Sequence, residues 1–180
     1  MIFTETSIGG AFLIEPEKVH DERGFFARTF CGREFEEQGL ISSWVQSSIS
    51  FNPKRATLRG LHYQDTPFEE IKLVRCTAGA IYDVIVDIRP GSPTFRKWFS
   101  VELTSSNHMT LYIPTGVAHG FQTLSDEVEV LYWMSEFYAA DSARGVRHDD
   151  PSFGINWPLP VSMISSRDLA WPLFDRLSGV

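Results

Sequence analysis

The chain has 180 residues, 43% of them hydrophobic and 22% charged, which is the composition of an ordinary globular protein long enough to bury a core. The net charge of −7 argues against nucleic acid as the main partner, because binding to a phosphate backbone calls for a basic surface. No apolar run approaches the roughly 20 residues of a membrane span, and the first residues lack the basic and apolar regions of a signal peptide, so we expect no membrane partner.

Short β-rich runs follow one another along the chain, separated by turn signals such as Arg89–Pro93 and Pro114–Gly116. In chain order the expected strands are Ala11–Ile14, Phe25–Phe30, Leu58–Gln64, Ile71–Thr77, Ala80–Ile88, Trp98–Leu103, Thr110–Ile113, Gly120–Leu124 and Glu129–Ser135. We expect a short helix over Gly32–Gly39, and an irregular Pro-rich tail with brief helical turns from Asp149 to Pro172. Many short strands at this spacing are typical of an antiparallel sandwich or barrel. The sequence therefore predicts an all-β fold in one domain spanning residues 1–180.

The side-chain parity of two expected strands indicates which faces point inward. Along residues 80–88 the even positions are apolar, whereas the odd positions combine isoleucine with Asp83 and Asp87. Along residues 127–134, Tyr132 shares a face with apolar neighbours, so we expect its ring to point inward and its hydroxyl to need a partner. A buried structural tyrosine would show the same pattern, so parity alone leaves the role of Tyr132 open.

Two of the five histidines lie in strand-like surroundings, and the other three lie in polar, turn-like ones. His62 falls inside the expected strand 58–64, and His119 follows the turn at 114–116. Each could be a base, a metal ligand or a satisfied core group. Metal sites in small β-barrels commonly use an H-x-H pair, a carboxylate and a third histidine, but Gln64 stands two residues after His62. The support for a metal site is therefore weak.

Nucleophilic and phosphate-loop chemistry have no motif in this chain, since G-x-S-x-G, G-x-G-x-x-G and Walker sequences are all missing. Cys31 and Cys76 form no disulfide framework and have no histidine neighbour, so we expect reduced thiols in a cytoplasmic protein. What remains is acid–base chemistry. The candidates are His62, Tyr132, Lys72, Arg59 and several acids.

A series of short motifs covers nearly the whole chain. They are Asp21–Phe26, Leu58–Gln64, Lys72–Arg75, Tyr82–Arg89, Ile113–Phe121, Leu131–Tyr132, Arg144–Arg147, Asp149–Pro151, Trp157–Leu159 and Ile164–Asp168. In these motifs and their order the chain resembles the dTDP-4-dehydrorhamnose 3,5-epimerase family. The resemblance implies a cupin-type jelly-roll β-barrel with short helical segments at the ends, a homodimer, and no metal or organic cofactor. It implies a nucleotide-sugar substrate, dTDP-4-keto-6-deoxy-D-glucose, epimerised at C3 and C5 to dTDP-4-keto-L-rhamnose.

The same resemblance assigns roles to individual residues. His62 matches the family's base, Asp168 the acid that orients it, and Tyr132 the proton donor on the opposite face. Substrate-contacting positions are matched by Gln46, Arg59, Lys72, His119 and Tyr138. Arg23 and Phe26 fall in the segment that meets the nucleotide, which the resemblance places in the partner subunit.

The chain also departs from the family pattern. Ser48 stands where an asparagine often touches ligand, His148 where a tryptophan is common, and Trp133 where many members have lysine. Three alternatives therefore stay open. The chain could be a related 3- or 5-epimerase acting on a different nucleotide-linked 4-keto-6-deoxy sugar, a metal-dependent cupin, or a non-catalytic sugar-binding cupin.

Epimerisation beside a ketone needs a base and an acid on opposite walls, together with positive charge for the enolate oxygen. Histidine suits the base because its ordinary pKa lies near working pH. Lys72 is the candidate for the enolate, and Arg59 for a phosphate. Arg59 and His62 are three residues apart, so a regular strand would turn them to opposite faces. We therefore predict an irregularity at Gly60 that brings both side chains inside.

Overall fold

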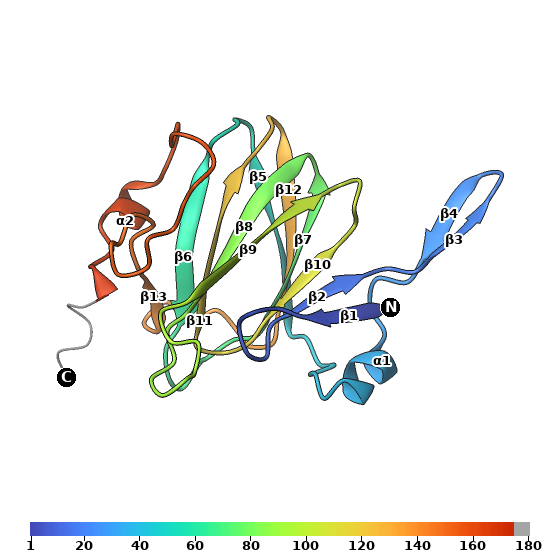
Figure 1. The fold of residues 1–180 in the computed structure, drawn as a ribbon, viewed down its shortest axis with the longest axis horizontal. Helices are drawn as coiled ribbons and strands as arrows, with labels where there is room; N and C mark the ends of the chain where they lie inside the picture. Colours follow the sequence, from blue (N-terminus) through green and yellow to red (C-terminus); the bar gives the residue numbers. More distant parts are fainter. Residues whose placement is uncertain (175–180) are drawn as a thin grey trace.

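The structure is a computed structural model of the chain that describes residues 1–174, so residues 175–180 of the expected 1–180 domain lie outside the described residues. Two antiparallel sheets face each other (Figure 1). The six-stranded sheet has the order β1 (Ile2–Glu5), β2 (Phe12–Glu15), β10 (Thr110–Ile113), β7 (Lys72–Ala78), β12 (Val128–Met134) and β5 (Gln46–Asn52). The five-stranded sheet has the order β13 (Ala143–Gly145), β6 (Leu58–Gln64), β11 (Val117–Thr123), β8 (Ala80–Asp87) and β9 (Trp98–Thr104).

The remaining elements lie outside the two sheets. Strands β3 (Lys18–Asp21) and β4 (Gly24–Ala27) form a hairpin that projects away from both sheets (Figure 1). Helix α1 (Gly32–Glu37) matches the expected short helix, and α2 (Ser166–Leu169) is a brief helical turn in the Pro-rich tail. Within residues 1–174, neither helix has the length and apolar character needed to cross a membrane.

Every strand expected from the sequence is present. Strands β6 and β10 have the expected ends, the others have shifted ends, and the expected strand at 25–30 ends early at Ala27. Four further strands, β1, β3, β5 and β13, were not expected. For β5, the reason is the polar character of its inward face. Its inward residues Ser48 and Ser50 are polar because they line a cavity, whereas Ile49 and Phe51 on the other face are 62% and 55% exposed. A strand whose polar side faces inward does not show the usual pattern.

Apolar side chains from both sheets fill the space between them. Ile81 and Ile85 of β8 are completely buried there, together with side chains from β7, β11 and β12. The mixed face of β8 is thus the inner one, and Asp83 lies on it. The other face of β8 packs through Val84 and Val86 against the segment that follows β13. Burial on both faces fixes β8 as the central strand on which the site is built.

The predicted irregularity in β6 is confirmed. His62 pairs with His119 and Arg59 with Phe121, so two residues of β6 oppose the single residue Gly120 of β11. Gly60 has φ +117°, and a Cβ there would lie 2.5 Å from the Gly120 Cα atom. Only glycine fits such a contact. The bulge turns Arg59 and His62 toward the same cavity.

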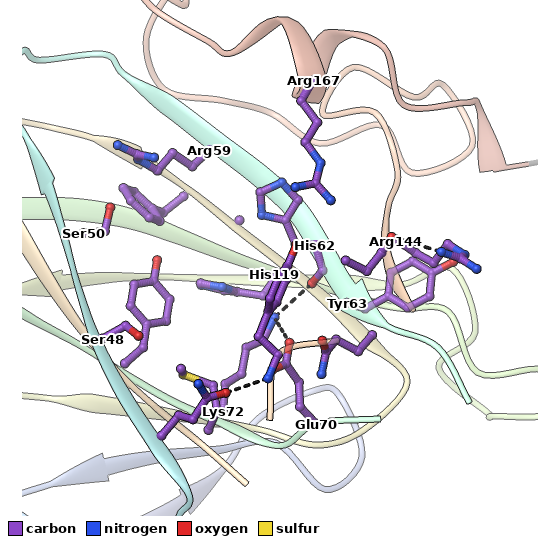
Figure 2. A pocket seen from close by; sticks show the side chains of 18 residues that line it. Ser48, Ser50, Arg59, His62, Tyr63, Glu70, Lys72, His119, Arg144 and Arg167 are labelled. Atoms are coloured by element: carbon purple, nitrogen blue, oxygen red, sulfur yellow. Dashed lines mark hydrogen bonds and ion pairs between the residues drawn. The ribbon is translucent and has the colours of Figure 1, made fainter. Parts of the chain in front are cut away.

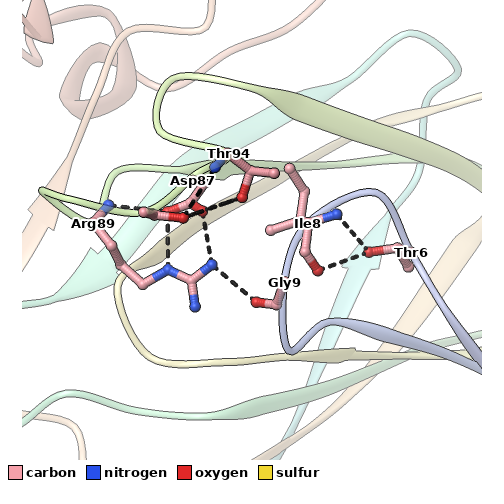
Figure 3. Close-up of polar contacts among 7 residues, drawn as sticks. Thr6, Ile8, Gly9, Asp87, Arg89 and Thr94 are labelled. Carbon is pink, nitrogen blue, oxygen red and sulfur yellow. Dashed lines mark hydrogen bonds and ion pairs between the residues drawn. The ribbon is translucent and has the colours of Figure 1, made fainter.

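A buried carboxylate at the end of β8 organises the loop before β9 and, through Arg89, links it to the loop between β1 and β2 (Figure 3). The Asp87 side chain is completely buried and accepts hydrogen bonds from Arg89, Ser92 and Thr94 at 2.6–3.0 Å. Arg89 also donates to the Gly9 carbonyl at 2.9 Å. Burial acts to raise the pKa of Asp87, but these hydrogen bonds outweigh it and lower the pKa to about 2.

We expect Asp87→Asn to reduce the free energy of unfolding at pH 7 by roughly 1.5–3 kcal/mol, because charge-assisted hydrogen bonds are lost. The pKa of the folded-state carboxyl lies below its ordinary value of 3.8, so its contribution is present above that value and is lost as the pH falls toward about 2. Urea unfolding at pH 7, 5 and 3 measures this, and the difference from wild type should shrink at the lowest pH. The control Asp149→Asn removes a half-exposed partner of Arg147 and should change stability by at most about 1 kcal/mol. A pH-independent difference for Asp87→Asn would contradict the assignment.

Candidate active site

A cavity of about 310 Å³ lies between the two sheets and opens to the surface (Figure 2). Strands from both sheets line it, together with the loops after β12 and before β7 and the helix α2. The predicted residues that line it are Gln46, Arg59, His62, Lys72, His119, Tyr132 and Tyr138. Lining residues that the sequence analysis did not propose include Ser48, Ser50, Tyr63, Gln64, Glu70, Phe121, Met134, Arg144 and Arg167.

His62 is held by Asp168, which lies 106 positions later in the chain. The His62 Nε2 atom is 2.7 Å from Asp168 Oδ1, and the Gly60 N–H donates to Oδ2 at 3.3 Å. Ser165 caps α2 by accepting from the Asp168 N–H, which fixes the carboxylate. Burial acts to raise the pKa of Asp168, but the hydrogen bonds from His62 and Gly60 outweigh it and keep the pKa below its usual value.

This arrangement suits His62 to proton transfer. Its side chain lines the cavity and is 42% exposed, while the Asp168 side chain behind it is 6% exposed. The second ring nitrogen, Nδ1, has no hydrogen bond to any residue in 1–174. A carboxylate on one ring nitrogen orients the imidazole and stabilises its protonated form, which leaves the other nitrogen to accept a proton.

Tyr132 faces the cavity from the opposite sheet. It lies on β12, on the same face as the buried Val128 and Val130, as the parity of the strand predicts. Burial, with a smaller effect from Asp83, raises the pKa of Tyr132 well above its ordinary value. Its hydroxyl therefore stays protonated at neutral pH. Among residues 1–174 it has no hydrogen-bond partner, so its proton is available to whatever occupies the cavity.

Lys72 supplies positive charge inside the cavity. Its Nζ atom lies 2.9 Å from Glu70 Oε1 and donates to the His62 carbonyl oxygen at 3.3 Å (Figure 2). The side chains of Lys72 and Glu70 are each 11% exposed. A cation in such dry surroundings interacts far more strongly with a developing negative charge than it would in water. Glu70 carries no motif that marks it in the sequence, apart from its position two residues before Lys72.

His119 pairs with a different carboxylate from His62, although the two histidines are opposite each other on β11 and β6. The His119 Nε2 atom lies 2.9 Å from Asp83 Oδ2, and both side chains are buried. Burial raises the pKa of Asp83 against the opposing effects of His119 and Lys72. The His119 ring packs edge-on against Tyr132, with centroids 5.9 Å apart. Within residues 1–174, no three side chains of the metal-binding types come together as a possible metal site.

Three arginines line the cavity from different elements. Arg59 comes from β6 and donates to Asn52 Oδ1 at 2.6 Å, and Arg144 comes from β13. Arg167 reaches from α2 toward His62 (Figure 2) and packs over Trp171 at 5.2 Å. Guanidinium groups bind phosphate oxygens as bidentate forks. The sequence signal for Arg167 was its place directly before Asp168.

The rim of the cavity is fixed by side-chain amides. Gln46 Oε1 accepts from the Tyr138 N–H at 2.6 Å, which leaves the Gln46 amide nitrogen for a ligand. Gln64 is buried and bonds to the backbone of Phe68, Phe137 and Ala139 at 2.7–3.1 Å. Tyr138 itself is 59% exposed at the opening. The two loops at the rim are therefore tied to the strands below them.

Besides Asp168, which lies behind His62, two predicted residues do not line this cavity. Arg23 and Phe26 are on the projecting hairpin and are not among the lining residues. The Arg23 side chain is 90% exposed and pairs with Asp21, and Phe26 is 77% exposed. The hairpin contacts its own chain at the loop between β9 and β10, away from the cavity, where Lys18 donates to the Ser106 carbonyl oxygen and Phe25 packs against His108.

Comparison with known proteins identifies the fold and the family. The family model for dTDP-4-dehydrorhamnose 3,5-epimerase matches residues 5–176. The enzyme of that name from Sinorhizobium fredii is 42% identical over 178 residues, which cover 98% of this chain and 91% of the relative. A crystal structure of the Bacillus anthracis enzyme with TDP and PPi bound has a TM-score of 0.92 and 40% identity, and covers 96% of this chain and 98% of that one.

The Legionella pneumophila enzyme, solved in complex with dTDP-4-keto-L-rhamnose, has a TM-score of 0.90 and 38% identity, and covers 97% of this chain and 93% of that one. These likenesses confirm the predicted all-β, cupin-type jelly-roll fold. The matches in sequence and structure extend over nearly the whole chain, so this protein belongs to the dTDP-4-dehydrorhamnose 3,5-epimerase family.

Proposed function

We propose that this chain inverts C3 and C5 of dTDP-4-keto-6-deoxy-D-glucose and releases dTDP-4-keto-L-rhamnose. The observation that carries the proposal is the placement of His62, backed by Asp168, on one sheet and of a protonated Tyr132 on the other. Inversion next to a ketone requires a base and an acid on opposite sides of one carbon. The names of the relatives point to the same reaction.

In the proposed mechanism, His62 removes the proton from a carbon beside the 4-ketone, and the electron pair of that C–H bond moves into an enolate. Asp168 stabilises the imidazolium that forms. Lys72 stabilises the negative charge on the enolate oxygen. Tyr132 then gives its hydroxyl proton to the opposite face of the carbon. His62 afterwards releases its extra proton to solvent, and Tyr132 takes a proton back from solvent. These two proton transfers take place once at C3 and once at C5, without a net change of oxidation state.

The diphosphate of the substrate fits the arginine-rich side of the cavity. Arg59 approaches it from strand β6, and Arg167 approaches it from helix α2. Gln46 offers its free amide nitrogen. His119 packs against the Tyr132 ring and forms part of the cavity wall. In this proposal the charged diphosphate lies near the opening and the uncharged sugar ring lies deeper inside.

We further propose that the chain acts as a homodimer in which the hairpin of each copy completes the cavity of the other. The hairpin exposes Val19 (69%) and Phe26 (77%) away from its own barrel, and apolar side chains this exposed on a projecting element are typical of an interface. In this arrangement Arg23 and Phe26 meet the nucleotide in the partner's cavity. The two free cysteines fit a cytoplasmic enzyme.

Incubation with dTDP-4-keto-6-deoxy-D-glucose in D2O should place deuterium at C3 and C5, as read by NMR. We expect His62→Asn to slow exchange at both positions by at least about 10²–10⁴-fold, since the base is lost. The control Glu102→Gln changes an exposed side chain of β9 outside the cavity and should leave exchange unchanged. Label at C3 alone would contradict double epimerisation, and near-native turnover by folded His62→Asn would contradict its role as the base.

Tyr132→Phe separates proton donation from packing, because phenylalanine fills the same space. We expect substrate to exchange with D2O through His62 but to return mostly uninverted, since the proton can come back only from the side it left. The matched control Tyr112→Phe removes a hydroxyl from a buried tyrosine of β10 outside the cavity. It should alter stability by about 0.5–1.5 kcal/mol and leave the rate intact. Normal epimer formation by Tyr132→Phe would refute its role and make Tyr138 the next candidate.

Mixed dimers test whether the hairpin serves the partner. His62→Ala and Arg23→Ala chains should each be nearly inactive alone. When the two are co-expressed, every mixed dimer has one cavity with both native residues, so activity should recover to about a quarter of the wild-type value. A monomeric active protein, or no recovery in verified mixed dimers, would show that Arg23 does not act across the interface.

A further inference from the structure

Glu70 forms an ion pair with Lys72 inside the cavity, and the proposed reaction gives Glu70 no role. The two residues are separated by one position at the start of β7, so on an extended chain their side chains point the same way. Their charged atoms are 2.9 Å apart, and each side chain is only 11% exposed. Figure 2 shows Glu70 beside Lys72 at the end of the cavity away from Arg167.

The hydrogen bonds of the Lys72 ammonium can be counted. An ammonium group has three N–H donors. The group donates one hydrogen bond, to the His62 carbonyl oxygen at 3.3 Å, and forms an ion pair with Glu70 at 2.9 Å, so N–H donors are left for a ligand. Without a fixed partner, the four-carbon stem of a lysine is flexible. The position of the ammonium and the direction of its remaining N–H groups therefore depend on the ion pair with Glu70 and the hydrogen bond to His62.

No other described carboxylate holds Lys72 in this way. Asp83 affects it electrostatically, but its own hydrogen bond goes to His119 at 2.9 Å. The His62 carbonyl is part of the backbone and supplies one weak contact. Glu70 is thus the group that determines where the Lys72 ammonium lies.

We propose that Glu70 is a positioning residue that fixes the Lys72 ammonium so that its free N–H points at the ketone oxygen of the substrate. This rests on the proposed function, in which Lys72 stabilises the enolate. Enolate stabilisation is realised in the transition state rather than in the bound substrate. Loss of the positioning should therefore appear in kcat and hardly in KM.

The test compares Glu70→Ala and Glu70→Gln, each in the wild-type and in the Lys72→Met background. We expect Glu70→Ala to lower kcat by roughly 10–100-fold with KM within about threefold, because misplacement of a reacting group is costly in rate. Glu70→Gln should keep kcat within about threefold, since a glutamine of the same length keeps an oxygen acceptor beside the Lys72 ammonium. In the Lys72→Met background neither change should lower kcat further. Glu69→Ala is the matched control, because Glu69 is exposed and bonds to Thr66 instead.

Three results would overturn the proposal. They are unchanged kcat in folded Glu70→Ala, a loss in Glu70→Gln equal to that in Glu70→Ala, and an equal loss in both backgrounds, which would indicate a structural effect. Failure of the proposed function looks different. In that case Lys72→Met would keep wild-type kcat, or wild-type protein would show no exchange in D2O. Circular dichroism and melting temperature of each variant separate misfolding from lost positioning.

Discussion

The backbones of β6 and β11 touch at Gly60 and Gly120, and the geometry of the site depends on this contact. A Cβ on Gly60 would lie 2.5 Å from Gly120 Cα, and one on Gly120 would lie 2.6 Å from the Arg59 carbonyl oxygen. The extra residue of β6 directs the side chains of Arg59 and His62 into the same cavity. The Gly60 N–H at this bulge donates to the Asp168 carboxylate. One local irregularity thus aligns Arg59, His62 and the carboxylate behind His62.

The cavity concentrates positive charge in a chain whose net charge is −7. Lys72 and three arginines line it, while Glu70 is paired and Asp168 lies behind His62. A local field of this kind attracts a nucleotide sugar even though the whole molecule is acidic. The apolar core between the sheets continues directly below, so the charges act in surroundings of low polarity.

Much of the fold could be predicted from alternation, and the site only in part. Strands β6, β8 and β12 show clear apolar patterns, and the position of Tyr132 follows from parity alone. The pairing of His62 with Asp168 joins positions 106 apart, so it came only from the resemblance. Strand β5 was missed because its inward serines face the cavity. Glu70 was missed because its role depends on how a loop meets β7, which no local pattern encodes.

The position of Asp168 separates the stability of the active site from the stability of the whole fold. The carboxylate belongs to a segment that docks on the outside of the barrel after the sheets are complete, where Trp171 fits against Gly145 and Phe153 and Phe174 cover β8. Undocking of this segment would take the Asp168 carboxylate away from His62 and leave the central core between the sheets in place. Catalytic competence therefore has its own local free energy, lower than that of global unfolding. During synthesis, all strands of the two sheets leave the ribosome before Asp168 does.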